Sequence, residues 1–160
     1  MFCRPEYYLG LQYGVLYNME LRNFVFGVLF DYHLDWVNGD VLHQASEFGY
    51  LNLFIDALKG RNVWVIGADY FSSLPYKLIR TPDSNSYGQN KDTFREIEAI
   101  DVTGYNINPV YLVASAMNSN IIIDKLPDTV TAIDIGSVFD PYLGRPRARY
   151  QHNMKAEWLW

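Results

Sequence analysis

Hydrophobic and polar positions along this chain follow two spacings, one typical of buried strands and the other of helices with one apolar face. A strand in a parallel sheet is covered on both faces, so nearly all of its residues are apolar. Four short runs fit this description and predict strands over 62–69, 78–81, 110–116 and 130–135. The first, third and fourth runs close in glycine or other small residues, which predicts a turn at each of these ends.

Helical spacing separates these runs. It is clearest in 51–58, where apolar side chains recur at i, i+3, i+4 and i+7 and a glycine follows as a stop signal. Asp40 stands where an N-cap would precede one further helix, and Asn118 or Ser119 before another. The further helices are predicted over 19–31, 41–48, 92–100 and 121–126.

The connecting segments carry turn and loop residues. Residues 1–18 are predicted to be irregular, 35–40 to be a turn, 70–77 to be a short helix or turn, and 82–90 to be a polar loop. Strands that alternate with helices are typical of a parallel sheet with right-handed crossovers. The sequence therefore predicts the α/β class, with a Rossmann-like parallel sheet of about four or more strands flanked by helices.

Composition fits a single folded unit. The chain has 160 residues, 49% of them hydrophobic and 19% charged, which is enough apolar material for one core. We therefore expect a single domain over 1–160, with a basic and aromatic tail over 145–160. The aromatic residues of both ends, including Trp158 and Trp160, are candidates for docking a partner subunit or a second copy.

Charge and cysteine content limit the classes of binding partner and the cellular location that we expect. A formal net charge of −5 argues against broad electrostatic binding to nucleic acid or anionic membranes. Cys3 is the single cysteine and cannot form an internal disulfide. The longest apolar runs, such as 24–30, fall short of the roughly 20 residues that span a membrane, and no signal-peptide pattern opens the chain. We therefore expect no membrane span and a cytoplasmic location.

Three of the predicted strand ends offer groups that suit a phosphate or a ribose. They are Gly67-Ala68-Asp69, Ser115-Ala116-Met117-Asn118 and Gly136-Ser137. In a parallel sheet these ends share one edge, where backbone N–H groups and small hydroxyls are available to a ligand. Such ends also occur in every α/β protein for structural reasons, so each is weak by itself.

Arginines follow the last of these ends. Arg145, Arg147 and Arg149 are spaced by two and would neutralise a diphosphate through bidentate hydrogen bonds if the segment folds back. The alternative is a solvated tail. The fingerprints of dinucleotide-binding and phosphate-loop proteins, G-x-G-x-x-G and G-x-x-x-x-G-K-[ST], are absent.

Three carboxylates are candidates for chemistry. Asp134 lies inside an apolar run, where an unpaired charge is costly, so it either pairs with an arginine or a helix N-terminus or faces a site. Asp140 follows the turn as a candidate base, metal ligand or helix cap. Asp40 and His43 are one helical turn apart and form either an acid/base pair or a capping residue beside a packed histidine.

Several blocks together resemble the GT-D type of glycosyltransferase domain of bacteria and their phages. The resemblance covers roughly residues 7 to 152, and its most specific part is Ala-Ile-Asp-Ile-Gly-Ser-Val-Phe-Asp-Pro-Tyr-Leu-Gly. The blocks are Trp36–Ser46, Val65–Gly67, Ser115–Met117, Ala132–Gly144 and Arg149–His152.

This resemblance implies a Rossmann-like fold and transfer of a sugar from a nucleotide-sugar, commonly a UDP-sugar, with a divalent cation such as Mn²⁺ or Mg²⁺. The acceptor hydroxyl would belong to a protein, a glycan or a modified nucleobase. Catalysis is expected from Asp40 or Asp140. The residues expected at the donor site are Asn38, Gly39, Gly67, Ser115, Asp134, Gly136, Ser137, Arg145, Arg149 and His152.

The chain departs from that family at its start. GT-D domains carry an Arg-Phe-Gly-Asp-Gly-Glu-like segment whose carboxylates suit metal and donor binding, and residues 1–18 do not match it. Three interpretations follow: the chain is a shortened or split form, it has lost metal dependence, or it binds without catalysis. The rival to the enzyme is therefore a non-catalytic binding or assembly subunit with a transferase fold.

Overall fold

The computed structural model describes residues 8–11, 19–31, 36–82, 91–99 and 109–145 of the chain. The chain forms two compact units, residues 1–48 and 49–160. Each unit is described by itself. None of the described helices is both long enough and apolar enough to cross a membrane.

The first unit pairs two short parallel strands, β1 (Leu9–Leu11) and β2 (Trp36–Asn38), and contains the helices α2 (Met19–Asp31) and α3 (Val41–Glu47). Both helices confirm their predictions. The prediction of a turn over 35–40 is wrong for 36–38, because Trp and Val favour extended backbone and pair with β1.

The turn itself is confined to the residues between β2 and α3. Asn38 Oδ1 accepts the backbone N–H of Asp40 at 2.9 Å, which is the local hydrogen bond of an Asx-turn. Asp40 occupies the N-cap position but makes no side-chain cap hydrogen bond. A Cβ on Gly10 would lie 3.2 Å from Gly39 Cα, so the two backbones approach closely at this point.

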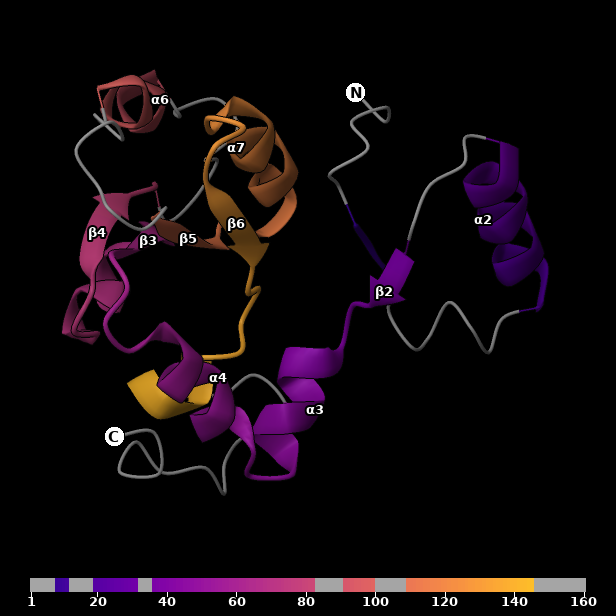
Figure 1. Ribbon diagram of the computed structural model, residues 1–160, viewed down its shortest axis with the longest axis horizontal. Helices are drawn as coiled ribbons and strands as arrows, with labels where there is room; N and C mark the ends of the chain where they lie inside the picture. Colours follow the sequence, from indigo (N-terminus) through magenta and orange to yellow (C-terminus); the bar gives the residue numbers. More distant parts are fainter. Residues whose placement is uncertain (1–7, 12–18, 32–35, 83–90, 100–108, 146–160) are drawn as a thin grey trace. The chain divides into compact units, whose positions relative to one another are not determined.

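The second unit has a Rossmann-like α/β fold around a four-stranded parallel sheet in the order β4-β3-β5-β6 (Figure 1). All four predicted strands are confirmed. Their bounds are β3 Val63–Gly67, β4 Lys77–Arg80, β5 Val110–Ala114 and β6 Thr131–Asp134. The helices of this unit are α4 Leu51–Leu58, α6 Lys91–Glu98 and α7 Ser119–Lys125, also as predicted.

Helices cover the sheet on two sides, with α6 and α7 on one side and α4 on the other (Figure 1). Side chains on both faces of β3 and β5 are therefore covered by apolar neighbours. Ile66, Tyr111 and Val113 are buried in one cluster with Ile97 of α6 and Ile122 of α7. This burial explains why the central strands are apolar at nearly every position.

The last strand is less buried than its sequence predicted. Among the described strands, β6 lies at the edge of the sheet and pairs only with β5, and Thr131 and Asp134 are exposed while Ala132 and Ile133 are half-buried. The apolar composition of the run indicates a central strand, but its position in the sheet order makes it an edge.

The chain order of the strands creates a switch point. After β3 the chain passes to β4 on one side and then crosses to β5 and β6 on the other. The crevice between β3 and β5, beyond their carboxyl ends, is where open α/β sheets bind ligands. Short 3-10 helices follow the strands β3, β5 and β6. They are η1 (Asp69–Ser73), η2 (Ala116–Asn118) and η3 (Asp140–Leu143).

Candidate functional site

The carboxyl ends of β3, β5 and β6 are neighbours on one edge of the sheet, as the sequence predicted. Gly67 stands opposite Ala114, and Asp134 stands opposite Val113. The next residue, Ile135, donates its N–H to the carbonyl of Val113 at 2.9 Å and extends the pairing by one step. The geometry therefore brings the predicted strand ends together.

The end of β5 is strained and carries a buried hydroxyl. Ala116 has a φ of 49°, in the left-handed region, which costs a residue with a Cβ about 1–2 kcal/mol. Ser115 is only 7% exposed, and its Oγ finds no hydrogen-bond partner among the described residues. Its backbone N–H donates to Ser119 Oγ at 3.2 Å. Strain and an unpartnered buried polar atom are both over-represented at functional sites.

Gly67 has a packing role at the end of β3. A Cβ at this position would lie 2.8 Å from Cδ2 of Phe71 and 3.3 Å from the carbonyl oxygen of Ala114. The ring of Phe71 therefore occupies the space beside Gly67 and is itself buried. The side of Gly67 that a donor was expected to contact is filled by the protein's own side chain.

The polar groups at the end of β6 also form hydrogen bonds within the protein. Asp134 is exposed, and its Oδ1 accepts the N–H of Gly136 at 3.0 Å. The sequence predicted a costly buried carboxylate that would need an arginine, a helix N-terminus or a site. The expected burial is wrong, because the edge position exposes Asp134 and the backbone two residues further on supplies a hydrogen-bond partner, while its place at a donor site stays a prediction. Ser137 is half-buried, and its carbonyl accepts the N–H of Asp140 at 3.0 Å.

Asp140 lies at the start of η3 and is fully buried, with 0% of its surface exposed. Its Oδ1 accepts a hydrogen bond from the hydroxyl of Tyr70 at 2.9 Å. A carboxylate in this position contacts protein and not solvent, so it is poorly placed to take a proton from an acceptor hydroxyl. The hydrogen bond instead ties η3, which follows β6, to η1, which follows β3.

Arg145 also lies beside Asp140 and Tyr70. Gly144 has a φ of 74° and reverses the chain after η3, and the N–H of Arg145 then donates to the carbonyl of Asp140 at 2.7 Å. The guanidinium carbon of Arg145 lies 4.2 Å from the centre of the Tyr70 ring, within cation–π range. Tyr70, Asp140 and Arg145 are called the Tyr70 cluster below.

The sequence interpretation missed Tyr70. The available signal was the aromatic pair Tyr70-Phe71 directly after the Gly-Ala-Asp end of a strand. Rings at that position pack against the strand end and against whatever follows the neighbouring strands. Nothing in the sequence, however, indicated that Tyr70 would meet Asp140, seventy residues away along the chain.

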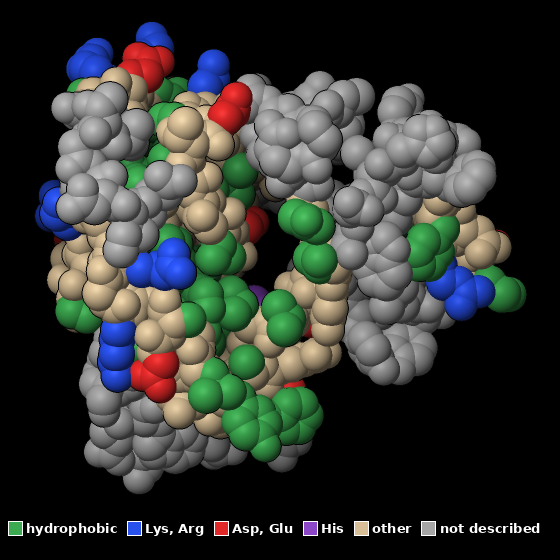
Figure 2. Space-filling view, viewed as in Figure 1, with side chains coloured by type: hydrophobic (Ala, Val, Ile, Leu, Met, Phe, Trp, Pro, Cys, Tyr) green, Lys and Arg blue, Asp and Glu red, His purple; other side chains and the backbone are tan. Residues whose placement is uncertain are grey.

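A second cation lies at the same edge. Arg80, the last residue of β4, donates from Nε to Oδ1 of Asp69 at 2.6 Å. This hydrogen bond, together with the negative charge of Asp69, raises the pKa of Arg80. Both side chains are exposed. On the face shown in Figure 2, the described Lys and Arg side chains stand among Asp and Glu and do not form one continuous basic patch.

The remaining predicted site residues fall elsewhere. Asn38, Gly39 and Asp40 belong to the first unit, where Asn38 also donates from Nδ2 to Gln44 Oε1 at 3.1 Å. Arg149 and His152, like Arg147, lie outside the described residues. The structure therefore brings together Gly67, Ser115, Asp134, Gly136, Ser137, Asp140 and Arg145 on the sheet edge or directly beyond it.

Metal-ligating side chains do not gather in the part of the chain that the structure describes. Across 8–11, 19–31, 36–82, 91–99 and 109–145, no group of three or more His, Cys, Asp or Glu side chains is close enough to hold a metal ion. No step of the chemistry is therefore assigned to a metal.

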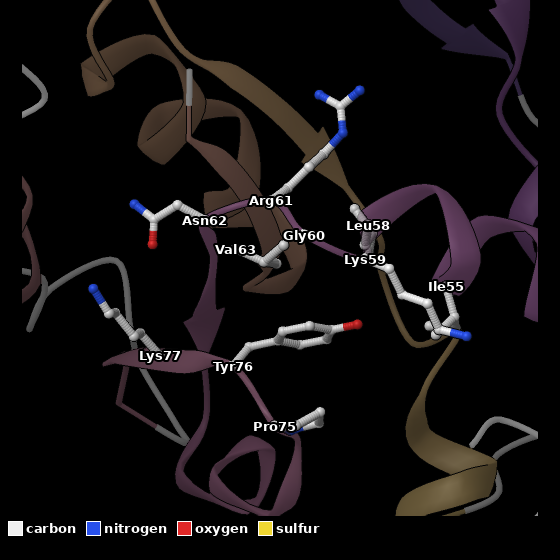
Figure 3. Close-up of a pocket in the computed structure, with 10 residues that line it drawn as sticks. All are labelled: Ile55, Leu58, Lys59, Gly60, Arg61, Asn62, Val63, Pro75, Tyr76 and Lys77. Atoms are coloured by element: carbon white, nitrogen blue, oxygen red, sulfur yellow. The ribbon is translucent and has the colours of Figure 1, made fainter. Parts of the chain in front are cut away.

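A groove of about 540 Å³ lies at the opposite edge, by the amino ends of β3 and β4 (Figure 3). The ring of Tyr76 crosses it, and the side chains of Arg61 and Lys77 extend away from that ring. The Lys77 Nζ lies 4.6 Å from the centre of the Trp64 ring, and burial raises the pKa of Tyr76. Its lining residues are Ile55, Leu58, Lys59, Gly60, Arg61, Asn62, Val63, Pro75, Tyr76 and Lys77.

Comparison of the chain with models of known protein families, with curated proteins and with solved structures finds no match. The GT-D resemblance therefore stays a prediction that rests on the blocks quoted above.

Proposed function

We propose that this chain binds a nucleotide-sugar of the UDP type beyond the carboxyl ends of β3, β5 and β6 and transfers the sugar to a hydroxyl acceptor. The observation that carries the proposal is the position of Arg145, whose guanidinium is held over Tyr70 just after β3. β3 forms one wall of the switch-point crevice in which open α/β sheets bind ligands.

The donor's diphosphate is the part that this edge suits. A guanidinium that stacks on a ring keeps its N–H groups in its own plane, where they can form two parallel hydrogen bonds to phosphate oxygens. Ser115 Oγ, at the end of β5, is a further donor, and it has no hydrogen-bond partner in the described part of the chain. The strain at Ala116 is consistent with a backbone shaped for a ligand.

The reaction is a displacement at the anomeric carbon of the sugar. The acceptor oxygen forms a bond to that carbon, the bond from the carbon to the diphosphate oxygen breaks, and the nucleoside diphosphate leaves with the electron pair. Arg145 offsets the charge that builds on the leaving phosphate. The acceptor's proton passes to a carboxylate.

The two carboxylates first considered as the base divide into different roles. Asp140 is buried and bonded to Tyr70, so its role in this proposal is to hold the Tyr70 cluster together. Asp40 is half-buried and belongs to the first unit, and it keeps the role of candidate base from the sequence resemblance alone.

Calorimetric titration of the 160-residue chain with UDP, and with a panel of other nucleoside diphosphates, tests the donor site. The proposal expects saturable binding of one nucleotide, measured with and without Mn²⁺ to establish whether a metal contributes. Absence of binding to every nucleotide under both conditions would overturn the proposal.

The burial of Asp140 also favours a second candidate, a non-catalytic subunit that keeps the transferase fold for binding or assembly. Release of UDP from UDP-sugars, measured with hydroxyl acceptors and with water, separates the two. Binding without any release supports the subunit, and release that is lost in Asp40→Asn supports the enzyme.

A further inference from the structure

Tyr70 contacts residues on two elements and at the chain reversal after them. Its ring stacks on Phe71 with centroids 4.4 Å apart, its hydroxyl donates to Asp140 at 2.9 Å, and the Arg145 guanidinium lies 4.2 Å from the centre of its ring. Phe71 is in turn packed against Gly67, where even a methyl group would collide with it. Contacts therefore run without interruption from strand β3 to the guanidinium.

These contacts fix the plane of the Tyr70 ring from two sides. One anchor is Phe71, on the same short helix η1, and the other is Asp140, on η3. Arginine is long, and an exposed guanidinium ordinarily samples many rotamers at a cost to any ligand that must order it. A fixed ring beneath the guanidinium removes part of that cost before the ligand arrives.

We infer that Tyr70 is a positioning residue that holds Arg145 in place to bind a diphosphate, an inference that rests on the proposed function. The ring carries the effect, and the hydroxyl acts by fixing the ring through Asp140. No contact between Tyr70 and the ligand is required.

The test is the dissociation constant for UDP of four variants of the full chain. Arg145→Ala should weaken binding about tenfold to a hundredfold, the range for lost hydrogen bonds to a charged group. Tyr70→Leu should weaken it about fivefold, the range for an exposed cation–π contact. Tyr70→Phe keeps the ring and should stay within about twofold of the unchanged chain. The double variant Tyr70→Leu with Arg145→Ala should bind like Arg145→Ala alone.

Tyr76→Leu is the matched control. Tyr76 is half-buried like Tyr70, but it lines the groove at the opposite edge of the sheet, so its replacement should leave the dissociation constant unchanged. Thermal melts of every variant identify any that fails to fold. If Tyr70→Leu does not fold, Tyr70→Met takes its place, because it also removes the ring.

Two results would overturn the inference while leaving the donor site intact. One is a Tyr70→Leu effect that persists in the Arg145→Ala background, since Tyr70 would then act independently of Arg145. The other is UDP binding that falls with Arg145→Ala but is unaffected in folded Tyr70→Leu. If the unchanged chain does not bind UDP or any other nucleoside diphosphate, the proposed function itself fails.

Discussion

At the carboxyl edge of the four-stranded sheet, the short helices η1 and η3 bring polar groups together, whereas at the amino edge a groove opens and its charged side chains diverge. The carboxyl edge holds the Tyr70 cluster, the strained Ala116 and the buried Oγ of Ser115. The amino edge has a groove of about 540 Å³, but the cations that line it have protein partners.

Those partners are specific. Lys59 pairs with Asp56 at 2.7 Å, Arg61 Nε donates to the carbonyl of Ala57 at 3.1 Å, and Lys77 lies over Trp64. The comparison teaches that the volume of a hollow and the convergence of its chemical groups are separate properties. A ligand needs both, but convergence is the one that determines what can be bound.

Replacing the buried carboxylate should have the largest effect. Asp140→Ala removes the acceptor of the Tyr70 hydroxyl and leaves a void in a fully buried position, which should lower the free energy of unfolding by about 2–3 kcal/mol. Urea denaturation measures this, and Asp128→Ala, at an exposed position, is the matched control. A loss below about 0.5 kcal/mol would show that the Tyr70 cluster does not stabilise the carboxyl edge.

Adding a methyl group at the end of β3 should have the second-largest effect on stability. Gly67→Ala places a Cβ 2.8 Å from the Phe71 ring and should destabilise the chain by about 1–3 kcal/mol. Gly27→Ala in helix α2, where a Cβ meets nothing within 4 Å, should instead be neutral or slightly stabilising. Equal melting temperatures for the two variants would mean that Phe71 moves aside freely, and the fixed ring of Tyr70 would lose its support.

Relieving the strain at the end of β5 should have a smaller effect of opposite sign. Ala116→Gly should raise the free energy of unfolding by about 0.5–1 kcal/mol, because glycine adopts a φ of 49° without cost. Ala114→Gly, two residues earlier within β5, should lower it by about 0.5–1 kcal/mol. If both substitutions lower the free energy of unfolding, the backbone at Ala116 is not strained.

The smallest effect is expected at the amino edge. Lys77→Ala and Arg61→Ala remove cations from the groove lining and should change the dissociation constant for UDP by less than about twofold, since neither lies at the carboxyl edge. A loss of UDP affinity as large as that of Arg145→Ala would show that UDP binds in the groove at the amino edge and not at the carboxyl edge.

The sequence predicted the sheet well because burial on both faces leaves a clear trace. Val63–Gly67 and Val110–Ala114 are central strands, and their apolar runs follow directly from that position. Helix α4 was predicted residue for residue, since its spacing and the following glycine are local signals. The edge position of β6 was not predictable, because the order of strands depends on contacts far apart in sequence.

The candidate site was predictable only in part for the same reason. The strand ends and Arg145 carry local signals: small residues, glycines and charge. The roles of Asp134 and Asp140 depend on exposure, which is 0% for Asp140 and high for Asp134, whereas the sequence placed Asp134 at the donor site and Asp140 in catalysis. Tyr70 joins Asp140 through a hydrogen bond and Arg145 through a ring contact, and both contacts span most of the second unit's sequence.

The most direct test of the central claim is a titration of the isotope-labelled chain with UDP, followed by the backbone amide resonances. The account predicts that the largest shifts fall at Tyr70, Ser115, Ala116 and Arg145, while Arg61 and Lys77 stay unchanged. Shifts confined to Arg61, Tyr76 and Lys77, or no shifts at saturating UDP, would contradict a nucleotide site at the carboxyl edge.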